Sequence, residues 1–363
     1  MSAGDPLIFI GGRPAYFSFF LRAIRVIRGE SFFGGALRPR GVLLDLGART
    51  TVRRAFGSGG EGPDAGQRWE AERLMGGQKL SNHSLEPGGQ TCEEPVVIIS
   101  DLHLGRSTRW KERLEPLRGV WRGAATMVFN GDTMNGHLAA NSALRGQIVS
   151  CLSEMCASDG ARAVFLAGNS DPYIDRLQHL FLSGGRVLVT HGDAVFPDVS
   201  PWRVRVRDIR EARDAAVRDM PAHQRDTLEG QLLSTRQASE AILAKTLGRK
   251  GLFPLRHLGL CLAPFRLWAV MRAWRRAPSL AAQFLRHYAP RARFIVMGHT
   301  HRRGIWRIEE TVVINTGSFE GFSSPAMVRL GGGEIAVQRI GREEGLYRPG
   351  ETLASFAPDG GGS

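Results

Sequence analysis

Side chains that commonly bind metal ions recur in five short motifs between residues 101 and 301. The motifs are Asp101-Leu102-His103, Gly131-Asp132, Gly168-Asn169-Ser170-Asp171, His191-Gly192-Asp193 and Gly298-His299-Thr300-His301. Imidazole, carboxylate and amide groups suit borderline or hard divalent ions, and none of the motifs offers the cysteine that a soft thiolate site would need. The pattern therefore predicts a metal site built from histidine, aspartate and asparagine.

The number of ligands favours two metal ions rather than one. The seven expected ligands are Asp101, His103, Asp132, Asn169, His191, His299 and His301. Seven is too many for one tetrahedral ion, and two ions that share a carboxylate fit the set better. Paired metals at roughly 3.5–4 Å generate a hydroxide nucleophile and neutralise the oxygens of an in-line phosphoryl displacement. Manganese is the expected metal, with Fe, Zn, Co and Ni as alternatives.

The elements that must position these side chains are short apolar strands. Almost every motif directly follows a β-branched or apolar run, namely Val96–Ile99, Met127–Phe129, Val164–Leu166, Val187–Val189 and Phe294–Met297. Runs of this kind, bounded by glycine or polar residues, are typical of buried strands. Helices are expected between them at about 108–122, 140–158 and 172–182. In an open α/β sheet the carboxyl ends of the strands face one crevice, so the motifs should meet there.

The ordered set DxH, GD, GNxD, HGD and GHxH resembles the calcineurin-like metallophosphoesterase superfamily, over about residues 94–341. Within it the chain is most similar to the bacterial UDP-2,3-diacylglucosamine hydrolase branch. The resemblance implies an α/β fold in which a two-sheet β-sandwich is flanked by helices. It also implies that Asp101, His103 and His301 hold one metal. Asn169, His191 and His299 would hold the other, with Asp132 bridging the two.

Two positions depart from the pattern of the superfamily. Asn135 stands where a GDxxD acid often orients a metal ligand, and an amide can still donate a hydrogen bond there. Ser170 stands where the protein phosphatases of the superfamily carry a histidine that protonates the leaving group. Because serine has no pKa near 7, it is a poor general acid. The departure favours cleavage of a pyrophosphate bond over hydrolysis of alkyl monoesters.

Further residues are expected to take part in catalysis or to bind the substrate. His191, His299 and Asp132 are expected to be catalytic through the metals they hold. Substrate contacts are expected from Asn135, His137, Ser170, Arg272 and Arg275. Four other histidines have no ligand-type neighbours and are interpreted as ordinary, namely His179, His223, His257 and His287.

Composition divides the chain into parts. Residues 1–92 are rich in glycine and arginine, and are predicted to be an unassigned, largely disordered extension. Its segment Leu7–Ile27 is either a peripheral amphipathic anchor or part of an extension upstream of a true start near Met75. A metallophosphoesterase domain is predicted for 93–345, with a disordered tail at 346–363. The four cysteines show no framework spacing, which favours reduced thiols and a cytoplasmic setting.

The insertion, about residues 197–290, is expected to form a basic helical cap. Residues 201–290 contain 17 Lys and Arg against 7 Asp and Glu, which gives this segment +10 of the chain's net charge of +13. Between 252 and 276 large apolar residues alternate with arginines, a pattern typical of a helix at a membrane surface. Three alternatives stay open: a lid packed on the sheet, a lid that also binds an anionic membrane at its cytoplasmic face, and a surface for nucleic acid.

The predicted function is hydrolysis of a phosphoester or, preferably, a pyrophosphate bond by a dinuclear metal centre. The favoured substrate is a phosphorylated small molecule or a lipid-linked one, of the UDP-2,3-diacylglucosamine type. One alternative is a nuclease or cyclic-nucleotide phosphodiesterase, because the basic charge would also suit a polyanion. The other is a metal-binding scaffold that has lost catalysis. The pattern gives no indication of the oligomeric state.

Overall fold

The computed structural model describes residues 92–105, 110–136, 140–200, 206–247, 264–320 and 324–358. Almost all of the predicted N-terminal extension, His137, Cys261 and the first part of the arginine-rich stretch lie outside these ranges. Cys151 and Cys156 lie on one helix, and among the described cysteines Cys92, Cys151 and Cys156 are free thiols.

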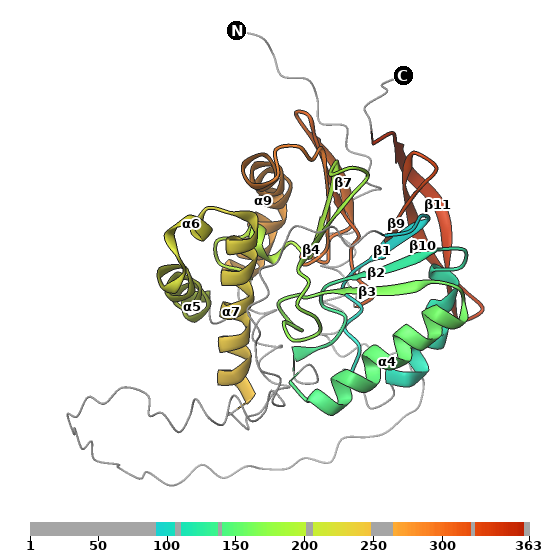
Figure 1. Ribbon diagram of the computed structural model, residues 1–363, viewed down its shortest axis with the longest axis horizontal. Coiled ribbons are helices and arrows are strands. Elements are labelled where there is room, and N and C mark those ends of the chain that lie inside the picture. The colour runs from blue at the N-terminus through green and yellow to red at the C-terminus, as the bar shows by residue number, and fades with distance from the viewer. Residues whose placement is uncertain are drawn as a thin grey trace, which may run out of the picture. The chain divides into compact units, whose positions relative to one another are not determined.

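The first sheet has six strands in the order β11-β10-β9-β1-β2-β3 (Figure 1). Its parallel half is β1 (Val96–Ile99), β2 (Thr126–Asn130) and β3 (Arg162–Leu166). Its antiparallel half is β9 (Ala326–Gly331), β10 (Glu334–Glu343) and β11 (Leu346–Phe356). β1 and β2 are buried along their whole length, which explains their unbroken apolar sequences.

The second sheet has five strands in the order β4-β5-β6-β8-β7. β5, β6 and β8 are parallel, and the edge strands β4 and β7 are antiparallel to their neighbours. The bounds are β4 (His179–Leu182), β5 (Val187–Thr190), β6 (Phe294–Met297), β7 (Gly304–Ile308) and β8 (Thr311–Asn315). The strands expected before the five motifs are therefore all present.

The two sheets pack face to face through one apolar core. Inward side chains of the first sheet, such as Ile98 and Val128, meet inward side chains of the second, such as Val189 and Val296. A second core lies on the outer face of the first sheet under α4 (Ser142–Ser158), and a third on the outer face of the second sheet under α9 (Pro264–Tyr288) (Figure 1). This confirms the predicted α/β sandwich flanked by helices.

The helices before the insertion follow the prediction only in part. α4 falls within the expected range 140–158, and the Asn141 side chain caps it by accepting the N–H of Leu144. The range 108–122 forms two short 3₁₀ helices, η1 (Trp110–Arg113) and η2 (Glu115–Val120). The prediction of a helix at 172–182 is wrong, because the last four residues of this range form β4. Their alternation of buried and exposed side chains is that of a strand.

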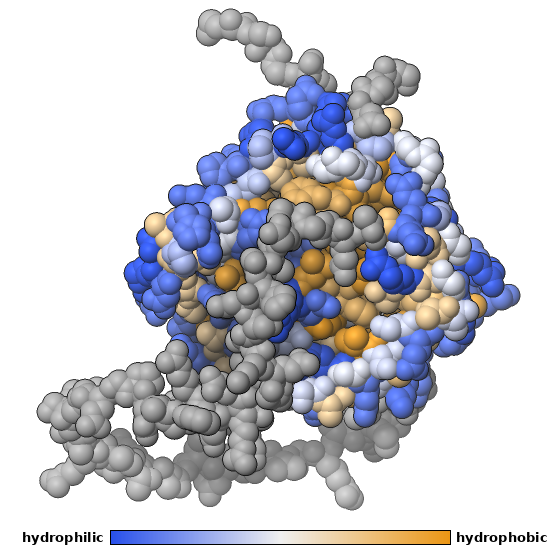
Figure 2. All heavy atoms as spheres, viewed as in Figure 1, coloured by the Kyte–Doolittle hydropathy of each residue, from blue (hydrophilic) through white to orange (hydrophobic). Residues whose placement is uncertain are grey.

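The insertion contributes helices between β5 and β6. They are α5 (Val206–Asp219), α6 (Ala222–Arg225), α7 (Leu228–Leu247) and α9. Hydrophilic side chains gather over α5 and α6 on the face shown in Figure 2. The apolar side of α9 is buried against the second sheet through residues such as Ala277 and Leu285. Among the helices within the described ranges, none is long and apolar enough to cross a bilayer.

The predicted disordered tail is a strand over most of its length. β11 pairs antiparallel with β10 and forms the edge of the first sheet. The strand contains Pro349 and Gly350, and an edge strand tolerates proline because one side of it needs no ladder hydrogen bonds. Shifts of the register near Gln338 accommodate the irregularity. The sheet therefore extends to Phe356, beyond the predicted domain end at 345.

Candidate metal centre

All five motifs follow the carboxyl ends of parallel strands. β1, β2 and β3 carry the first three motifs, and β5 and β6 carry the last two. Backbone hydrogen bonds join neighbouring loops, since Asp101 N–H donates to Gly131 O over 3.1 Å and Gly298 N–H donates to His191 O over 2.9 Å. The loops of the two sheets also meet, since His299 N–H donates to Asp101 Oδ2 over 2.9 Å, as the strand pattern predicted.

The first ligand group consists of Asp101, His103 and His301. The two imidazole Nε2 atoms are 3.0 Å apart, and Asp101 Oδ1 lies 3.2 Å from His301 Nε2 and 3.7 Å from His103 Nε2. Within the described residues, Asp101 Oδ1 is buried without a hydrogen-bond partner. Three atoms that carry lone pairs thus face one point, and a divalent cation there would satisfy all of them.

The second ligand group is built around Asp132 and His191. Asp132 Oδ1 lies 3.4 Å from His191 Nε2, which is 3.3 Å from Asn169 Oδ1. The other carboxylate oxygen, Asp132 Oδ2, lies 3.8 Å from His103 Nε2 in the first group. Asp132 therefore faces both groups, as its predicted bridging role requires. Asp101 also lies close to Asp132 and His191, with one ligand atom from each within 4.8 Å of the others. The sequence did not predict this second shared carboxylate.

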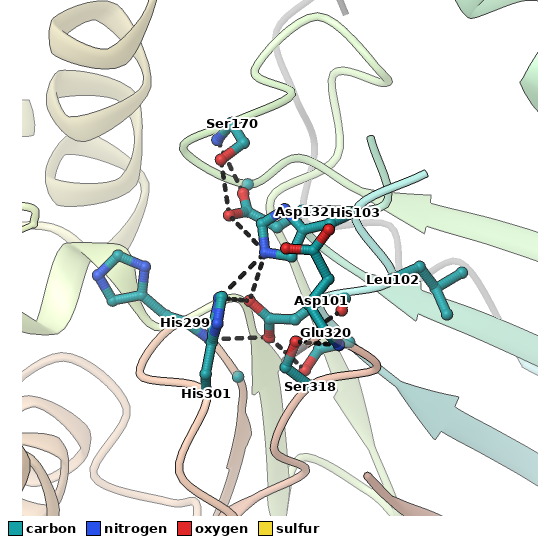
Figure 3. A network of polar contacts seen from close by, with 12 residues as sticks. Asp101, Leu102, His103, Asp132, Ser170, His299, His301, Ser318 and Glu320 are labelled. Carbon is teal, nitrogen blue, oxygen red and sulfur yellow. Dashed lines mark hydrogen bonds and ion pairs between the residues drawn. The ribbon is translucent and has the colours of Figure 1, made fainter. Parts of the chain in front are cut away.

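His299 is held differently from the other histidines. Its Nε2 lies 2.6 Å from the carbonyl oxygen of Val199, and its backbone N–H donates to Asp101 Oδ2 over 2.9 Å. Its ring lies edge-on to that of His191, with centroids 5.1 Å apart, and points away from the first ligand group in Figure 3. With Nε2 bound to a carbonyl, the imidazole would offer Nδ1 to a metal of the second group.

Asn130, at the end of β2, connects the two sheets beside the site. Its side-chain Nδ2 donates to the backbone carbonyl oxygen of Thr190 over 2.9 Å. The backbone carbonyl oxygen of Asn130 lies 3.2 Å from His191 Nδ1. The second contact fixes the His191 ring so that Nε2 faces Asp132. Asn130 is fully buried, and the motifs gave no signal for this role.

Asp171 organises the loops although no role was predicted for it. Its two carboxylate oxygens accept the backbone N–H groups of Gly168, Asp132 and Met134, each over 3.0 Å. Burial and the nearby negative charge of Asp132 raise the pKa of Asp171 to about 7. Asp171 therefore fixes the loops after β2 and β3 to each other. The position of Asp171 at the end of the Gly168-Asn169-Ser170-Asp171 motif was the sequence signal from which this role could have been predicted.

Ser170 and Asn135 both contact predicted metal ligands. Ser170 donates from its backbone N–H to Asp132 Oδ1 over 2.7 Å and from its hydroxyl to Asp132 Oδ2 over 2.8 Å. Asn135 Nδ2 donates to the carbonyl oxygen of His103 over 3.2 Å, which is the orienting hydrogen bond expected of it. Figure 3 shows the Ser170 hydroxyl directed at Asp132. Both residues thus position ligands, and their predicted substrate contacts stay predictions.

Five of the seven predicted ligands have a left-handed backbone. The φ values are 53° for Asp101, 48° for His103, 49° for Asp132, 65° for His299 and 56° for His301. Such conformations are uncommon for residues other than glycine, cost about 1–3 kcal/mol each, and cluster at functional sites. A scaffold whose loops served packing alone would have no reason to concentrate this strain at its metal-binding side chains. The backbone therefore favours a functional centre.

The charges of the site favour metal binding. Burial alone would lower the pKa of His191, but the negative charges of Asp132, Asp101 and Asp193 outweigh it and raise this pKa to about 9. Burial would raise the pKa of Asp101, yet the neighbouring imidazoles of His103 and His301 hold it well below its usual range. Burial and the positive charge of His191 lower the pKa of His299 to about 3. Without metals, His191 therefore carries a proton at pH 7.

Metal loading is expected to release at least one proton per chain at pH 7–8. The His191 imidazole must lose its proton to coordinate a cation, and the pKa of His103 is also raised, although burial opposes this. Because protons compete with the metal, affinity should rise with pH until about 9. Calorimetric titration with Mn²⁺ in two buffers of different ionisation enthalpy measures the number released. A His179→Gln control should give the same number, and a value of zero would contradict the assignment of His191.

The arginines predicted to bind substrate lie on α9. Arg272 and Arg275 are exposed on this helix, and their contacts with a substrate stay predictions. Trp274 between them is half-buried, and its indole N–H donates to the carbonyl oxygen of Thr300 over 2.9 Å. This tryptophan therefore supports the loop that carries His299 and His301.

Glu320 is a further carboxylate at the site that the motifs missed. It is half-buried in the loop after β8, where its backbone N–H donates to the Ser318 hydroxyl over 3.0 Å. Figure 3 shows its side chain extending beside His103, and its negative charge acts with those of Asp132 and Asp101 to raise the pKa of His103 against burial. An isolated acid in a polar loop carries no distinctive sequence signal.

Comparisons with known proteins give similarities in structure. No protein-family model matches the sequence. No curated protein matches it. A Vps29 double mutant from Entamoeba histolytica is 12% identical with a TM-score of 0.33, over 72% of this chain and 98% of its own. A predicted phosphoesterase from Streptococcus pneumoniae is 15% identical with a TM-score of 0.28, over 71% and 97%. A dimetal phosphatase from Danio rerio is 12% identical with a TM-score of 0.36, over 70% and 99%.

Proposed function

We propose that this chain is a dinuclear metal-dependent phosphoesterase of the calcineurin-like metallophosphoesterase superfamily. The observation that carries the proposal is the geometry of Asp132, whose two carboxylate oxygens lie 3.4 Å from His191 Nε2 and 3.8 Å from His103 Nε2. A carboxylate between two sets of imidazoles is the arrangement by which proteins hold two cations a few ångströms apart. The left-handed backbone at five of the predicted ligands supports the same conclusion.

Each ligand group would hold one of the two cations. Asp101, His103 and His301 would hold one cation, and Asn169, His191 and His299 the other, with Asp132 between them. Two divalent ions at such a site supply a nucleophile from water and neutralise the phosphoryl oxygens of an in-line displacement. The mixture of carboxylate, amide and imidazole groups fits Mn²⁺ well, and also Fe, Zn, Co and Ni.

Ser170 guides the choice of bond to be cleaved. Its hydroxyl is engaged by Asp132 and has no pKa near neutrality, so it would not protonate a leaving group. Substrates whose leaving group departs as a stable anion, such as pyrophosphates and activated diesters, should therefore react better than alkyl monoesters. On this ground we propose a nucleotide diphosphate linkage as the natural substrate class.

A lipid-linked substrate of the UDP-2,3-diacylglucosamine type is the finer proposal. Its support is the row of exposed Arg272, Arg275 and Arg276 on α9, beside the exposed Met271. The indole N–H of Trp274 and the apolar side of α9 are engaged by the protein itself, so they would not meet lipid. A membrane contact would depend mainly on the charged row. The same row would also suit a polynucleotide, which makes nuclease activity the alternative to be tested.

The test is a substrate panel with the full chain, loaded with Mn²⁺ and freed of metal by a chelator. The panel contains bis-p-nitrophenyl phosphate, p-nitrophenyl phosphate, a UDP-linked glycolipid in mixed micelles, a cyclic nucleotide and a short DNA. Activity that depends on metal, with the diester and the diphosphate preferred to the monoester, supports the proposal. Preference for DNA or the cyclic nucleotide would favour the alternative. No turnover with two metals bound would identify a silent scaffold.

A further inference from the structure

Val199 combines a strained backbone with a contact to a predicted metal ligand. Its φ is 54°, and among the described non-glycine residues with positive φ it is the only β-branched one. Left-handed backbone is a genuine outlier for such a residue, because its branched Cβ crowds the chain. The carbonyl oxygen of Val199 lies 2.6 Å from His299 Nε2. The strain is therefore located where a backbone carbonyl meets a functional imidazole.

The insertion supplies what keeps Val199 in place. Its side chain is 1% exposed and packs in a small core with Ile209 of α5 and Ile242 of α7. The other non-glycine residues with positive φ outside the motifs lie in turns between strands; Ser183, between β4 and β5, is an example. Val199 thus depends on two helices of the insertion, α5 and α7.

Arg213 of α5 fixes the segment that leads to Val199. Its guanidinium is buried and donates to the carbonyl oxygens of Phe196 and Pro197 over 2.8 and 3.1 Å. A second α5 residue, Arg210, donates to Asp198 Oδ1 over 2.6 Å. Three consecutive residues before Val199 are therefore held by one helix of the insertion. Movement of α5 would move the carbonyl that His299 contacts.

We propose that Val199 is a positioning residue for His299, and that the core of the insertion thereby controls occupancy of the second metal position. The proposal rests on the proposed function, since it assumes two metal positions. The carbonyl of Val199 holds Nε2–H of the imidazole, which leaves Nδ1 as the coordinating atom and sets the plane of the ring. Val199 contacts the second ligand group through His299, so the affinity of the first metal position should not depend on Val199.

The decisive variant is Val199→Gly in the full chain. Glycine relieves the backbone strain and removes the side chain that anchors the carbonyl in the core of the insertion. Titration with Mn²⁺, followed by electron paramagnetic resonance and calorimetry, gives the affinities of the two positions without any assay of turnover. We expect one dissociation constant to stay unchanged and the other to rise about 10- to 100-fold. Ser183→Gly, which relieves the same type of strain in the turn between β4 and β5, should change neither.

A second pair of variants separates the inference from a simple loss of stability. Ile242→Ala opens a cavity in the core of the insertion, and Ile148→Ala opens one under α4. Both should lower the unfolding temperature, but only Ile242→Ala should weaken the second metal, and Ile242→Val should largely restore it. Equal affinities in Val199→Gly, Ile242→Ala and the unaltered chain would overturn the inference. Fewer than two metals in the unaltered chain would instead overturn the proposed function.

Discussion

Replacement of Asp132 by asparagine is expected to lower kcat/KM on a diester by roughly a hundredfold or more. The amide has nearly the same size, but it removes the negative charge that faces both ligand groups. It also replaces one of the two oxygens that accept hydrogen bonds from Ser170 by an NH₂ group, which cannot accept the Ser170 hydrogen bond there. Metal content and turnover should therefore fall together. Elemental analysis after gel filtration gives the first quantity, and initial rates give the second.

The matched control for this variant is Asp175→Asn. Asp175 is exposed and belongs to the segment after β3, where its carboxylate accepts the N–H of Leu177. This substitution should leave rates within about twofold, since surface changes away from a site are generally mild. If Asp132→Asn kept two metals and near-normal rates, the assignment of the shared carboxylate would be wrong.

Replacement of Asp171 by alanine is expected to destabilise the metal-free protein by about 3 kcal/mol or more. It leaves three backbone N–H groups without their acceptor, and each buried donor that loses its partner costs roughly 1–3 kcal/mol. Relief of the repulsion between Asp171 and Asp132 offsets a part of this. Denaturant unfolding at several pH values measures the effect. Asp175→Ala, which frees one N–H in an exposed loop, should cost less than about 1 kcal/mol.

The effect of Asp171→Ala should be larger at pH 5 than at pH 8. Burial and the charge of Asp132 raise the pKa of Asp171 in the folded chain to about 7, above its ordinary 3.8. Between these two values the folded state binds a proton that the unfolded state does not, so the contribution of this group to stability falls as pH rises through the window. The alanine variant has no group that titrates at this position, so its stability does not show this fall and the difference from the unaltered chain is larger at low pH. A destabilisation that grew with pH would contradict the role of burial at Asp171.

Strand runs and motifs predicted most of the sheet pattern at the site. Val96–Ile99 and Phe294–Met297 are buried on all sides, so their sequences are uniformly apolar and easily recognised. β4 was missed because four residues are too few for a clear period. β11 was missed because Pro349 and Gly350 disfavour a strand interior, and the sequence alone does not identify the sheet edge at which proline is tolerated.

The contacts that orient the predicted ligands were harder to predict than the ligands themselves. Val199 acts through its carbonyl, and any residue type has one, so the sequence carries no sign of it. Glu320 and Asn130 lie outside the motifs, and they reach the site only because β8 and β2 end beside it. The sequence identifies the chemical type of each side chain, whereas the direction of a backbone group depends on tertiary packing.

The amide of Asn130 has a consequence for how the centre meets its ions. By donating to the carbonyl oxygen of Thr190 in the facing sheet, it prevents β2 and β5 from sliding past each other at the end that carries Asp132 and His191. The spacing of Asp132 and His191 is then a property of the sandwich itself rather than of whichever cations arrive. Such a template needs little reorganisation on loading, and it would select among metals by how well their radii match a spacing that is already set.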